Sequence, residues 1–114
     1  MLSTKEKGTI LCIIKRCQRI MAKVSCIAKS DLDEDEDTFE IISFNIFQIG
    51  ELAKQFDDNF LQKHNGVPWR QIKGMRDKIG HGYDTIDHDR VWYTAQKDIP
   101  PLLNYCRKIL EEDL

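Results

Sequence analysis

Apolar side chains recur at alternating steps of three and four residues along three long stretches of this sequence, and this pattern limits the possible fold most strongly. Such a repeat gathers apolar residues on one stripe of an α-helix. It predicts helices over about Thr4–Lys29 and Asp37–Phe56, and a last helical region that starts near Asp87 or His88. The three stripes are Ile10, Ile14, Cys17, Met21, Val24 and Ala28; Phe39, Ile42, Ile46, Ile49, Ala53 and Phe56; and Trp92, Ala95, Ile99, Leu102, Cys106 and Ile109.

Shorter elements connect these helices. Asp57–His64 is predicted to form a short helix, and Asn65–Pro68 a turn. Pro68 suits the first turn of a further helix that extends to about Ile79, because the missing N–H of proline costs nothing there. Pro100–Pro101 lies inside the last apolar stripe and predicts a kink, or a break with a restart of the helix.

The fold class follows from these elements. The chain has 114 residues, which is the size of one domain, so residues 1–114 are expected to form a single unit. Only six glycines and three prolines are present, and no segment alternates cleanly between apolar and polar residues. We expect an all-α antiparallel helical bundle of about four to five helices.

The second long helix has apolar residues on two faces. Phe44, Phe47 and Leu52 lie off its main stripe, which indicates either a central place in the bundle or burial against another subunit. We expect a homodimer that forms through the apolar faces of the first two helices.

A basic ridge runs along the first helix. Lys15, Arg19 and Lys23 are four residues apart, so they share one face. This face is either a solvated helix surface or a surface that contacts phosphates, and the sequence leaves both interpretations open.

Composition and charge exclude several classes of protein. The net charge of −2 excludes a strongly cationic nucleic-acid binder, although it leaves room for a local basic patch. No apolar stretch is long enough to span a membrane, and the first residues lack the apolar core of a signal peptide. A cytoplasmic location is therefore expected.

We expect no metal site and no cofactor. The cysteines form no C-x-x-C pair and are expected to be small buried or half-buried apolar residues in a reducing compartment: Cys12, Cys17, Cys26 and Cys106. The acidic run Asp31–Asp37 has Glu36 where a calcium loop needs glycine, so a solvated helix cap is expected instead. His81 and His88 have no third ligand at a useful spacing.

Four further aromatic or imidazole side chains have ordinary structural interpretations. Trp69 and Trp92 lie on helical stripes and are expected to pack in the core. His64 and His88 are expected to lie in loops or at helix caps.

One stretch concentrates positive charge. Between Lys63 and Tyr83 there are five cationic side chains and a single acid, Asp77, which gives a local charge of +4 in a protein whose net charge is −2. Such a local excess suits a polyanion, for example RNA or the phosphate of a nucleotide.

Arg76, His81 and Tyr83 can share one pocket if the chain bends between them. On an ideal helix, Arg76 and His81 would be about 140° apart. Gly80 can end the helix and Gly82 allows a second bend, so that a cation, an imidazole and a phenol reach the same side. The imidazole suits proton transfer near neutral pH and the guanidinium suits a phosphate. The competing interpretation is an ordinary basic helix end that is closed by glycine.

The arrangement Arg76-x4-His81-x-Tyr83 resembles the R-x4-H-x-Y motif of the HEPN superfamily, and more closely the HepT family of ribonuclease toxins. Further segments resemble the same family over nearly the whole chain. They are Ile49–Lys54, Pro68–Ile72 followed by Gly74–Arg76, Val91–Trp92 and Asp98–Pro100.

The resemblance implies a HEPN-like helical bundle that forms a homodimer and cleaves RNA without a metal. His81 would act as general base or acid, and Arg76 would stabilise the charged phosphate. Asp77 stands where the family often has asparagine and would orient one of these two side chains. The resemblance also makes Glu51 a neighbour of the pocket. The local excess of positive charge, independently of the resemblance, predicts that Arg70, Lys73 and Lys78 bind RNA.

The same resemblance implies a partner. The HepT family is paired with nucleotidyltransferase antitoxins of the MntA type, and Tyr83 would be the residue to which the antitoxin transfers AMP. A bulky anion on this phenol would repel RNA phosphate.

Two other interpretations remain open. The bundle can be a non-catalytic HEPN module that docks a nucleotidyltransferase or binds a nucleotide, or it can be a purely structural dimer. Only the intact Arg76, His81 and Tyr83 favour the ribonuclease.

Overall fold

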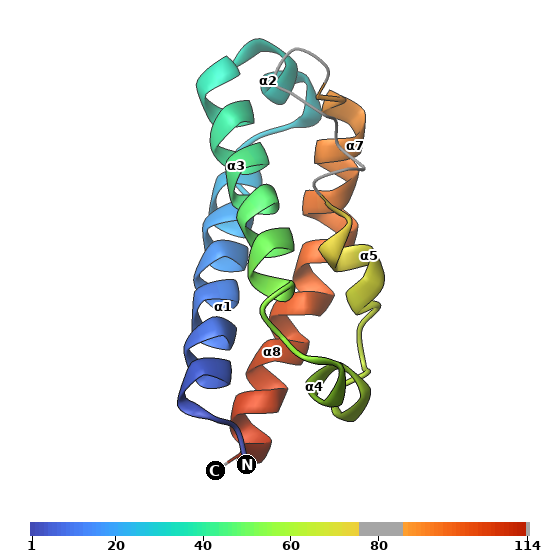
Figure 1. Cartoon of the computed structure of the whole chain (residues 1–114). Helices are drawn as coiled ribbons and strands as arrows, with labels where there is room; N and C mark the ends of the chain where they lie inside the picture. Colours follow the sequence, from blue (N-terminus) through green and yellow to red (C-terminus); the bar gives the residue numbers. More distant parts are fainter. Residues whose placement is uncertain (76–85, 114) are drawn as a thin grey trace.

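The structure, a computed structural model, describes residues 1–75 and 86–113. These residues form helices with no strand among them, which confirms the predicted all-α bundle. The molecule measures 45 × 27 × 20 Å along its principal axes. Figure 1 shows its elongated shape, with the long helices side by side. Within the described ranges, no helix is both long and apolar enough to cross a lipid bilayer.

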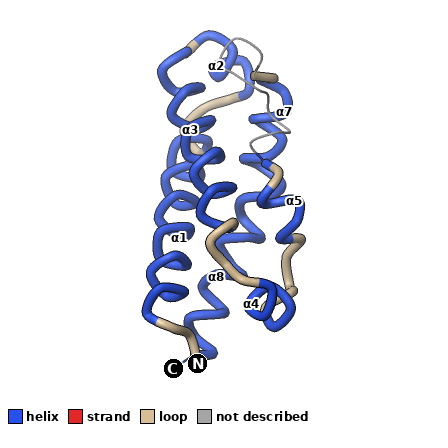
Figure 2. The backbone as a smooth tube through the Cα atoms, viewed as in Figure 1, coloured by secondary structure: helices blue, strands red, loops and turns tan. Residues whose placement is uncertain are grey.

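Three long helices form the body of the bundle. They are α1 (Thr4–Val24), α3 (Glu36–Ala53) and α8 (Ile99–Asp113). α1 packs against both α3 and α8, and it runs antiparallel to each of them (Figures 1 and 2). The two chain ends meet because the Leu2 backbone N–H donates a 2.7 Å hydrogen bond to Oδ1 of Asp113.

The predicted stripes form the core. Most of the stripe residues are buried, and they belong to one continuous cluster of apolar side chains. The second apolar face of α3 divides: Phe47 and Leu52 pack against this core, whereas Phe44 is exposed. The apolar faces of α1 and α3 thus serve mainly to hold a single chain together, and the homodimer stays a prediction.

Side-chain caps explain where several helices begin. Ser3 caps α1 in a reciprocal arrangement with Glu6, and Asp35 accepts a hydrogen bond from the Thr38 backbone at the start of α3. The acidic run therefore supplies a cap, as predicted. Asp57 and Asp87 cap α4 (Asp58–Lys63) and α7 (His88–Tyr93) in the same way.

The structure corrects the end of the first helix. α1 ends at Val24, about five residues earlier than predicted, and a short helix, α2 (Lys29–Glu34), follows it. Asp31 accepts a hydrogen bond from the Ala28 backbone N–H, and Leu32 is fully buried. This cap and this single apolar anchor hold a helix that is too short to show a periodic pattern.

The last helical region is continuous from His88 to Asp113. It consists of α7 (His88–Tyr93), a π-helical turn η2 (Thr94–Asp98) and α8. The Ile99 N–H reaches back to the Thr94 carbonyl, which is the wider spacing of a π-helix. Pro100 and Pro101 follow as the second and third residues of α8, and neither has an N–H to continue the hydrogen-bond ladder. Of the predicted kink or break with a restart, the structure shows no break: the helix widens locally just before the two prolines.

The cysteine prediction is correct for only two of the four residues. Cys17 and Cys106 are buried, whereas Cys12 and Cys26 are exposed. Trp69 is buried and Trp92 packs against the core, which confirms the prediction for both indoles.

Candidate functional site

The predicted catalytic segment lies outside the described residues. It carries Arg76, Asp77, Lys78, His81 and Tyr83. The roles of these five residues, and the pocket they would share, stay predictions. The structure does describe both flanks of the segment, as well as Glu51, Arg70 and Lys73.

Both flanks are anchored in the same core. Met75 is 4% exposed and Ile86 is 8% exposed, and both belong to the central apolar cluster. On the N-terminal side, α5 (Trp69–Lys73) packs against α3. On the C-terminal side, α7 packs against α2 and α3. The motif therefore connects two helices whose positions are fixed against α3.

An aromatic cluster fixes α5. The rings of Phe56 and Phe60 stack 3.9 Å apart, and the Trp69 indole packs edge-on against the Phe56 ring at 5.3 Å. Phe60 belongs to α4 (Asp58–Lys63), which is capped by Asp57. Because Trp69 is the first residue of α5, this contact ties the start of α5 to the end of α3 and to α4.

The helix predicted over Pro68–Ile79 is interrupted. α5 ends at Lys73, and the Gly74 backbone N–H closes it by hydrogen bonding back to carbonyls of the preceding turn. Pro68 stands at the N-cap rather than inside the first turn. The part of the predicted helix beyond residue 75 is outside the described residues.

The structure brings Arg70 and Lys73 together. Both line a groove of about 470 Å³ between α4 and α5, which we name the α4–α5 groove. Its described lining is Asp58, Leu61, Gln62, Asn65, Val67, Trp69, Arg70 and Lys73. Two cations face a single acid there, and two side-chain amides add further hydrogen-bonding groups. Such a surface suits a phosphate backbone, in which charge and amide donors hold the chain without reading its bases.

Gln62 and Asn65 could not be identified as groove residues from the sequence. Isolated amides beside a turn carry no periodic or charge signal. Only the fold of α4 against α5 shows that they line the same surface as Arg70 and Lys73.

Glu51 lies on the last turn of α3, near its C-terminal end. Its Oε1 accepts a 3.0 Å hydrogen bond from Nζ of Lys54, and the carboxylate is exposed. Glu51 is not among the described residues that line the α4–α5 groove. Its place beside a catalytic pocket stays a prediction.

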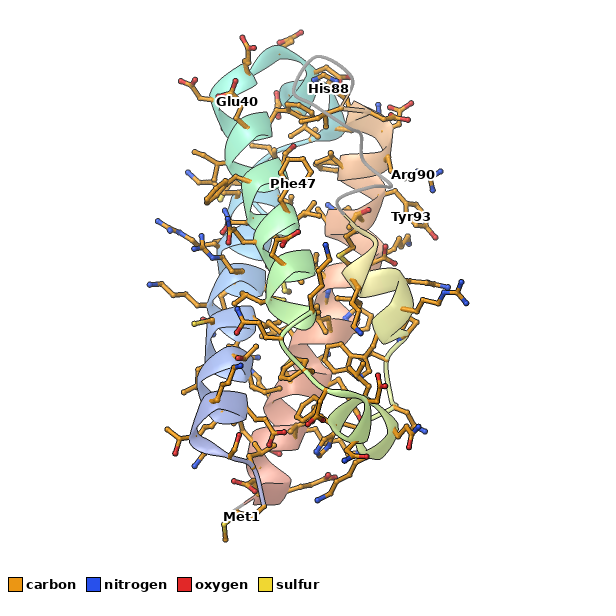
Figure 3. The ribbon with its side chains drawn as sticks, in the orientation of Figure 1. Met1, Glu40, Phe47, His88, Arg90 and Tyr93 are labelled. Atoms are coloured by element: carbon orange, nitrogen blue, oxygen red, sulfur yellow. The ribbon has the colours of Figure 1, made fainter. Side chains whose placement is uncertain are left out.

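The two described histidines occupy structural positions. His64 is the C-cap of α4, as predicted, and its ring packs against Phe60. The pKa of His64 is lowered, mainly because the ring is partly buried and to a smaller extent because the positive charge of Lys63 is near. His88 is the first residue of α7 and stacks on Phe39 with ring centroids 3.8 Å apart (Figure 3). Asp87, not His88, caps that helix.

Comparison with known proteins decides the family. The sequence model of the family described as Ribonuclease HepT-like matches residues 13–109. The chain belongs to the HepT-like ribonuclease family.

Several relatives of this HepT-like protein carry ribonuclease names. "Putative RNase TTE0752" of Caldanaerobacter subterraneus subsp. tengcongensis is 32% identical over 101 residues, which is 89% of this chain and 90% of the relative. "Probable ribonuclease HepT" of Thermococcus cleftensis is 38% identical over 61 residues, or 54% of this chain and 56% of the relative.

A third relative is a longer protein. "Gamma-glutamylcyclotransferase and putative RNase MJ0434" of Methanocaldococcus jannaschii is 32% identical over 100 residues, which is 82% of this HepT-like chain and 45% of the relative. No solved structure matches the chain.

Proposed function

We propose that this protein is a metal-independent endoribonuclease and the toxin of a toxin–antitoxin pair. The observation that carries the proposal is membership of the HepT-like ribonuclease family together with the intact Arg76-x4-His81-x-Tyr83 in the sequence. The α4–α5 groove, directly before this segment in the chain, supports it with a cationic surface for RNA.

The proposed reaction is an internal phosphoryl transfer within the RNA. The 2′-oxygen forms a bond to the adjacent phosphorus, and the bond from phosphorus to the 5′-oxygen of the next nucleotide breaks. One proton leaves the 2′-hydroxyl and one reaches the departing 5′-oxygen. His81 carries out one of these proton transfers, since imidazole titrates near neutral pH.

The remaining polar residues bind and stabilise the RNA. Arg76 donates hydrogen bonds to the phosphate as negative charge develops, and Asp77 orients Arg76 or His81. Arg70, Lys73 and Lys78 hold the phosphate backbone. Glu51 is a supporting neighbour of the pocket. The products are a 2′,3′-cyclic phosphate and a 5′-hydroxyl, and the reaction consumes no water.

The proposal includes control by a partner in the cytoplasm. A nucleotidyltransferase antitoxin of the MntA type transfers AMP from ATP to Tyr83. The phenol oxygen loses its proton and bonds to the α-phosphorus, while the bond between the α- and β-phosphates breaks and pyrophosphate leaves. The added phosphodiester is anionic and bulky, so it repels and obstructs RNA. The toxin acts as a homodimer.

Product mapping and mass spectrometry test these steps separately. Cleaved RNA should carry cyclic-phosphate ends, and 3′-phosphomonoesters alone, without any cyclic intermediate at early times, would refute the internal attack. Tyr83→Phe should still cleave RNA and should gain no AMP when it is produced with the antitoxin. AMP on another residue of that variant would refute the assignment of Tyr83.

The second candidate function is a non-catalytic module that docks a nucleotidyltransferase or binds a nucleotide. It is favoured if the unmodified protein forms a stable complex with the antitoxin but cleaves no RNA.

A further inference from the structure

A second cationic groove lies between α1 and α3. Its volume is about 330 Å³, and we name it the α1–α3 groove. Its described lining is Arg16, Arg19, Lys23, Glu40, Ile41, Phe44 and Asn45. The groove shares no lining residue with the α4–α5 groove.

Phe44 presents an aromatic ring at this surface. The side chain is 46% exposed, which is unusual for a phenylalanine that could pack in a core. The guanidinium carbon of Arg16 lies over this ring, 5.5 Å from its centroid. The guanidinium covers one face of the ring, so an unpaired nucleobase can stack on the guanidinium plane or on the part of the ring that is left exposed.

Arg16 is held in position by a buried amide. Nη1 of Arg16 donates a 3.1 Å hydrogen bond to Oδ1 of Asn45, and Nδ2 of Asn45 donates a 2.7 Å hydrogen bond to the Ile41 carbonyl. Asn45 is 3% exposed. The aromatic–cation pair is therefore built before any ligand arrives, which reduces the entropy lost on binding.

Arg19 and Lys23 extend the positive surface along α1. Both are exposed, and both belong to the basic ridge that the sequence analysis left open. Four residues of helix separate them by about 6 Å along the axis, so they can contact successive phosphates of an extended strand. Glu40 is the one acid in the described lining of this groove, and Figure 3 shows it at the outer side of α3.

We propose that the α1–α3 groove binds a single-stranded segment of RNA, with a base on Phe44 and the phosphates on Arg16, Arg19 and Lys23. This inference rests on the proposed function, in which RNA is the substrate. It adds a second binding surface that shares no lining residue with the α4–α5 groove, so that a longer RNA would be held at two separate segments.

A second copy of the chain is the other candidate for this face, since Leu11, Ile41 and Phe44 are exposed on α1 and α3. In a twofold dimer the same patch faces itself. The three cations of the groove would then be brought close to their own copies, and the described lining offers one acid per chain, Glu40, to offset them. Charge therefore favours a polyanion over a second copy.

Fluorescence anisotropy with a labelled, single-stranded 2′-O-methyl RNA tests the proposal. The blocked 2′-oxygen cannot attack, so binding is measured whether or not the protein is a nuclease. Phe44→Ala should weaken binding by at least about fivefold, as expected for the loss of one stacked base. Phe44→Trp should bind at least as well as the wild type.

Phe44→Leu separates stacking from simple apolar contact. Leucine keeps an apolar side chain but has no π face, so we expect it to bind RNA as weakly as Phe44→Ala. Recovery of full affinity by leucine would contradict a stacked base.

The phosphate contacts have their own test. Arg19→Ala combined with Lys23→Ala should lower the slope of log affinity against log salt by roughly 1.4, at about 0.7 for each lost phosphate contact with a single strand. The matched control is Lys5→Ala combined with Lys108→Ala, which removes the same charge from exposed positions outside both grooves. The control should leave the slope nearly unchanged.

Three results would overturn the inference. One is wild-type affinity in both the Phe44→Ala and the Arg19/Lys23 variants. Another is a wild-type dimer in light scattering that becomes a monomer in Phe44→Ala, which would assign this face to a second copy. The third is no binding of the 2′-O-methyl RNA by the wild-type protein. If the wild-type protein binds the 2′-O-methyl RNA but does not cleave ordinary RNA, the result would count against the proposed function and not against this inference.

Discussion

The indole Nε1 of Trp69 donates a hydrogen bond to the backbone carbonyl of His64. This bond closes the turn between α4 and α5, and the ring is buried against Phe56 and Phe60. The start of the helix that leads to the catalytic segment is thus fixed by one side chain that supplies both apolar contact and a polar donor.

Trp69→Phe should therefore destabilise the protein, because the His64 carbonyl loses its indole donor while most of the aromatic contact remains. We expect the free energy of unfolding to fall by about 1–3 kcal/mol. Trp69→Ala should cost about 3–5 kcal/mol, since it also leaves a cavity. Urea unfolding followed by circular dichroism measures both. Wild-type stability of Trp69→Phe would show that the hydrogen bond contributes nothing.

The four cysteines should divide into two pairs in their reactivity. Cys12 and Cys26 are exposed, whereas burial keeps the pKa of Cys17 and Cys106 high and their sulfur atoms inaccessible. A brief treatment of the native protein with iodoacetamide should add two labels, and treatment in urea should add four. Mass spectrometry counts the labels, and labelling of Cys17 in the native protein would contradict the described core.

The buried thiols also predict a loss of stability at alkaline pH. Burial raises the pKa of Cys106 to about 12 from the ordinary value of 9.0, so the folded protein holds this proton more tightly than the unfolded chain does. The contribution of this thiol to the free energy of unfolding is fully present below about pH 9 and is lost as the pH rises toward 12. In urea unfolding above pH 9, Cys106→Ala should therefore show a smaller decline than the wild type. An identical decline would show that this thiol has no part in the alkaline loss.

The α4–α5 groove predicts electrostatic binding of RNA. Arg70→Ala combined with Lys73→Ala should weaken binding of a 2′-O-methyl RNA to a similar extent for different sequences, because phosphate contacts read no bases. The slope of log affinity against log salt concentration should fall by roughly 1.4, at about 0.7 for each lost phosphate contact. The Lys5/Lys108 double variant is again the matched control. A loss of affinity confined to one RNA sequence would contradict a phosphate-binding role.

The long helices could be predicted from the sequence because their apolar stripes span many turns. α2 could not, because it is held by one buried residue, Leu32, and by one cap. The widening before Pro100 was also missed, since the sequence places the two prolines but not the way in which the preceding turn adapts to them.

The cationic residues of one groove could likewise be predicted from the sequence, whereas the aromatic–cation pair of the other could not. Arg70 and Lys73 could be identified from local charge alone. The contact between Arg16 and Phe44 depends on how α1 lies beside α3, and no spacing within either helix encodes that register. The assignment of catalytic roles to Arg76 and His81 depends on the sequence motif and on membership of the family.

RNA cleavage in the presence of EDTA tests the central claim most directly. Wild-type protein, shown by mass to be unmodified, is compared with His81→Ala and with the matched control His88→Ala, whose imidazole stacks on Phe39 at the start of α7. We predict cleavage by the wild type and by His88→Ala and none by His81→Ala, with all three proteins equally helical. Undiminished cleavage by His81→Ala, or activity that EDTA abolishes, would contradict a metal-independent mechanism that depends on this imidazole.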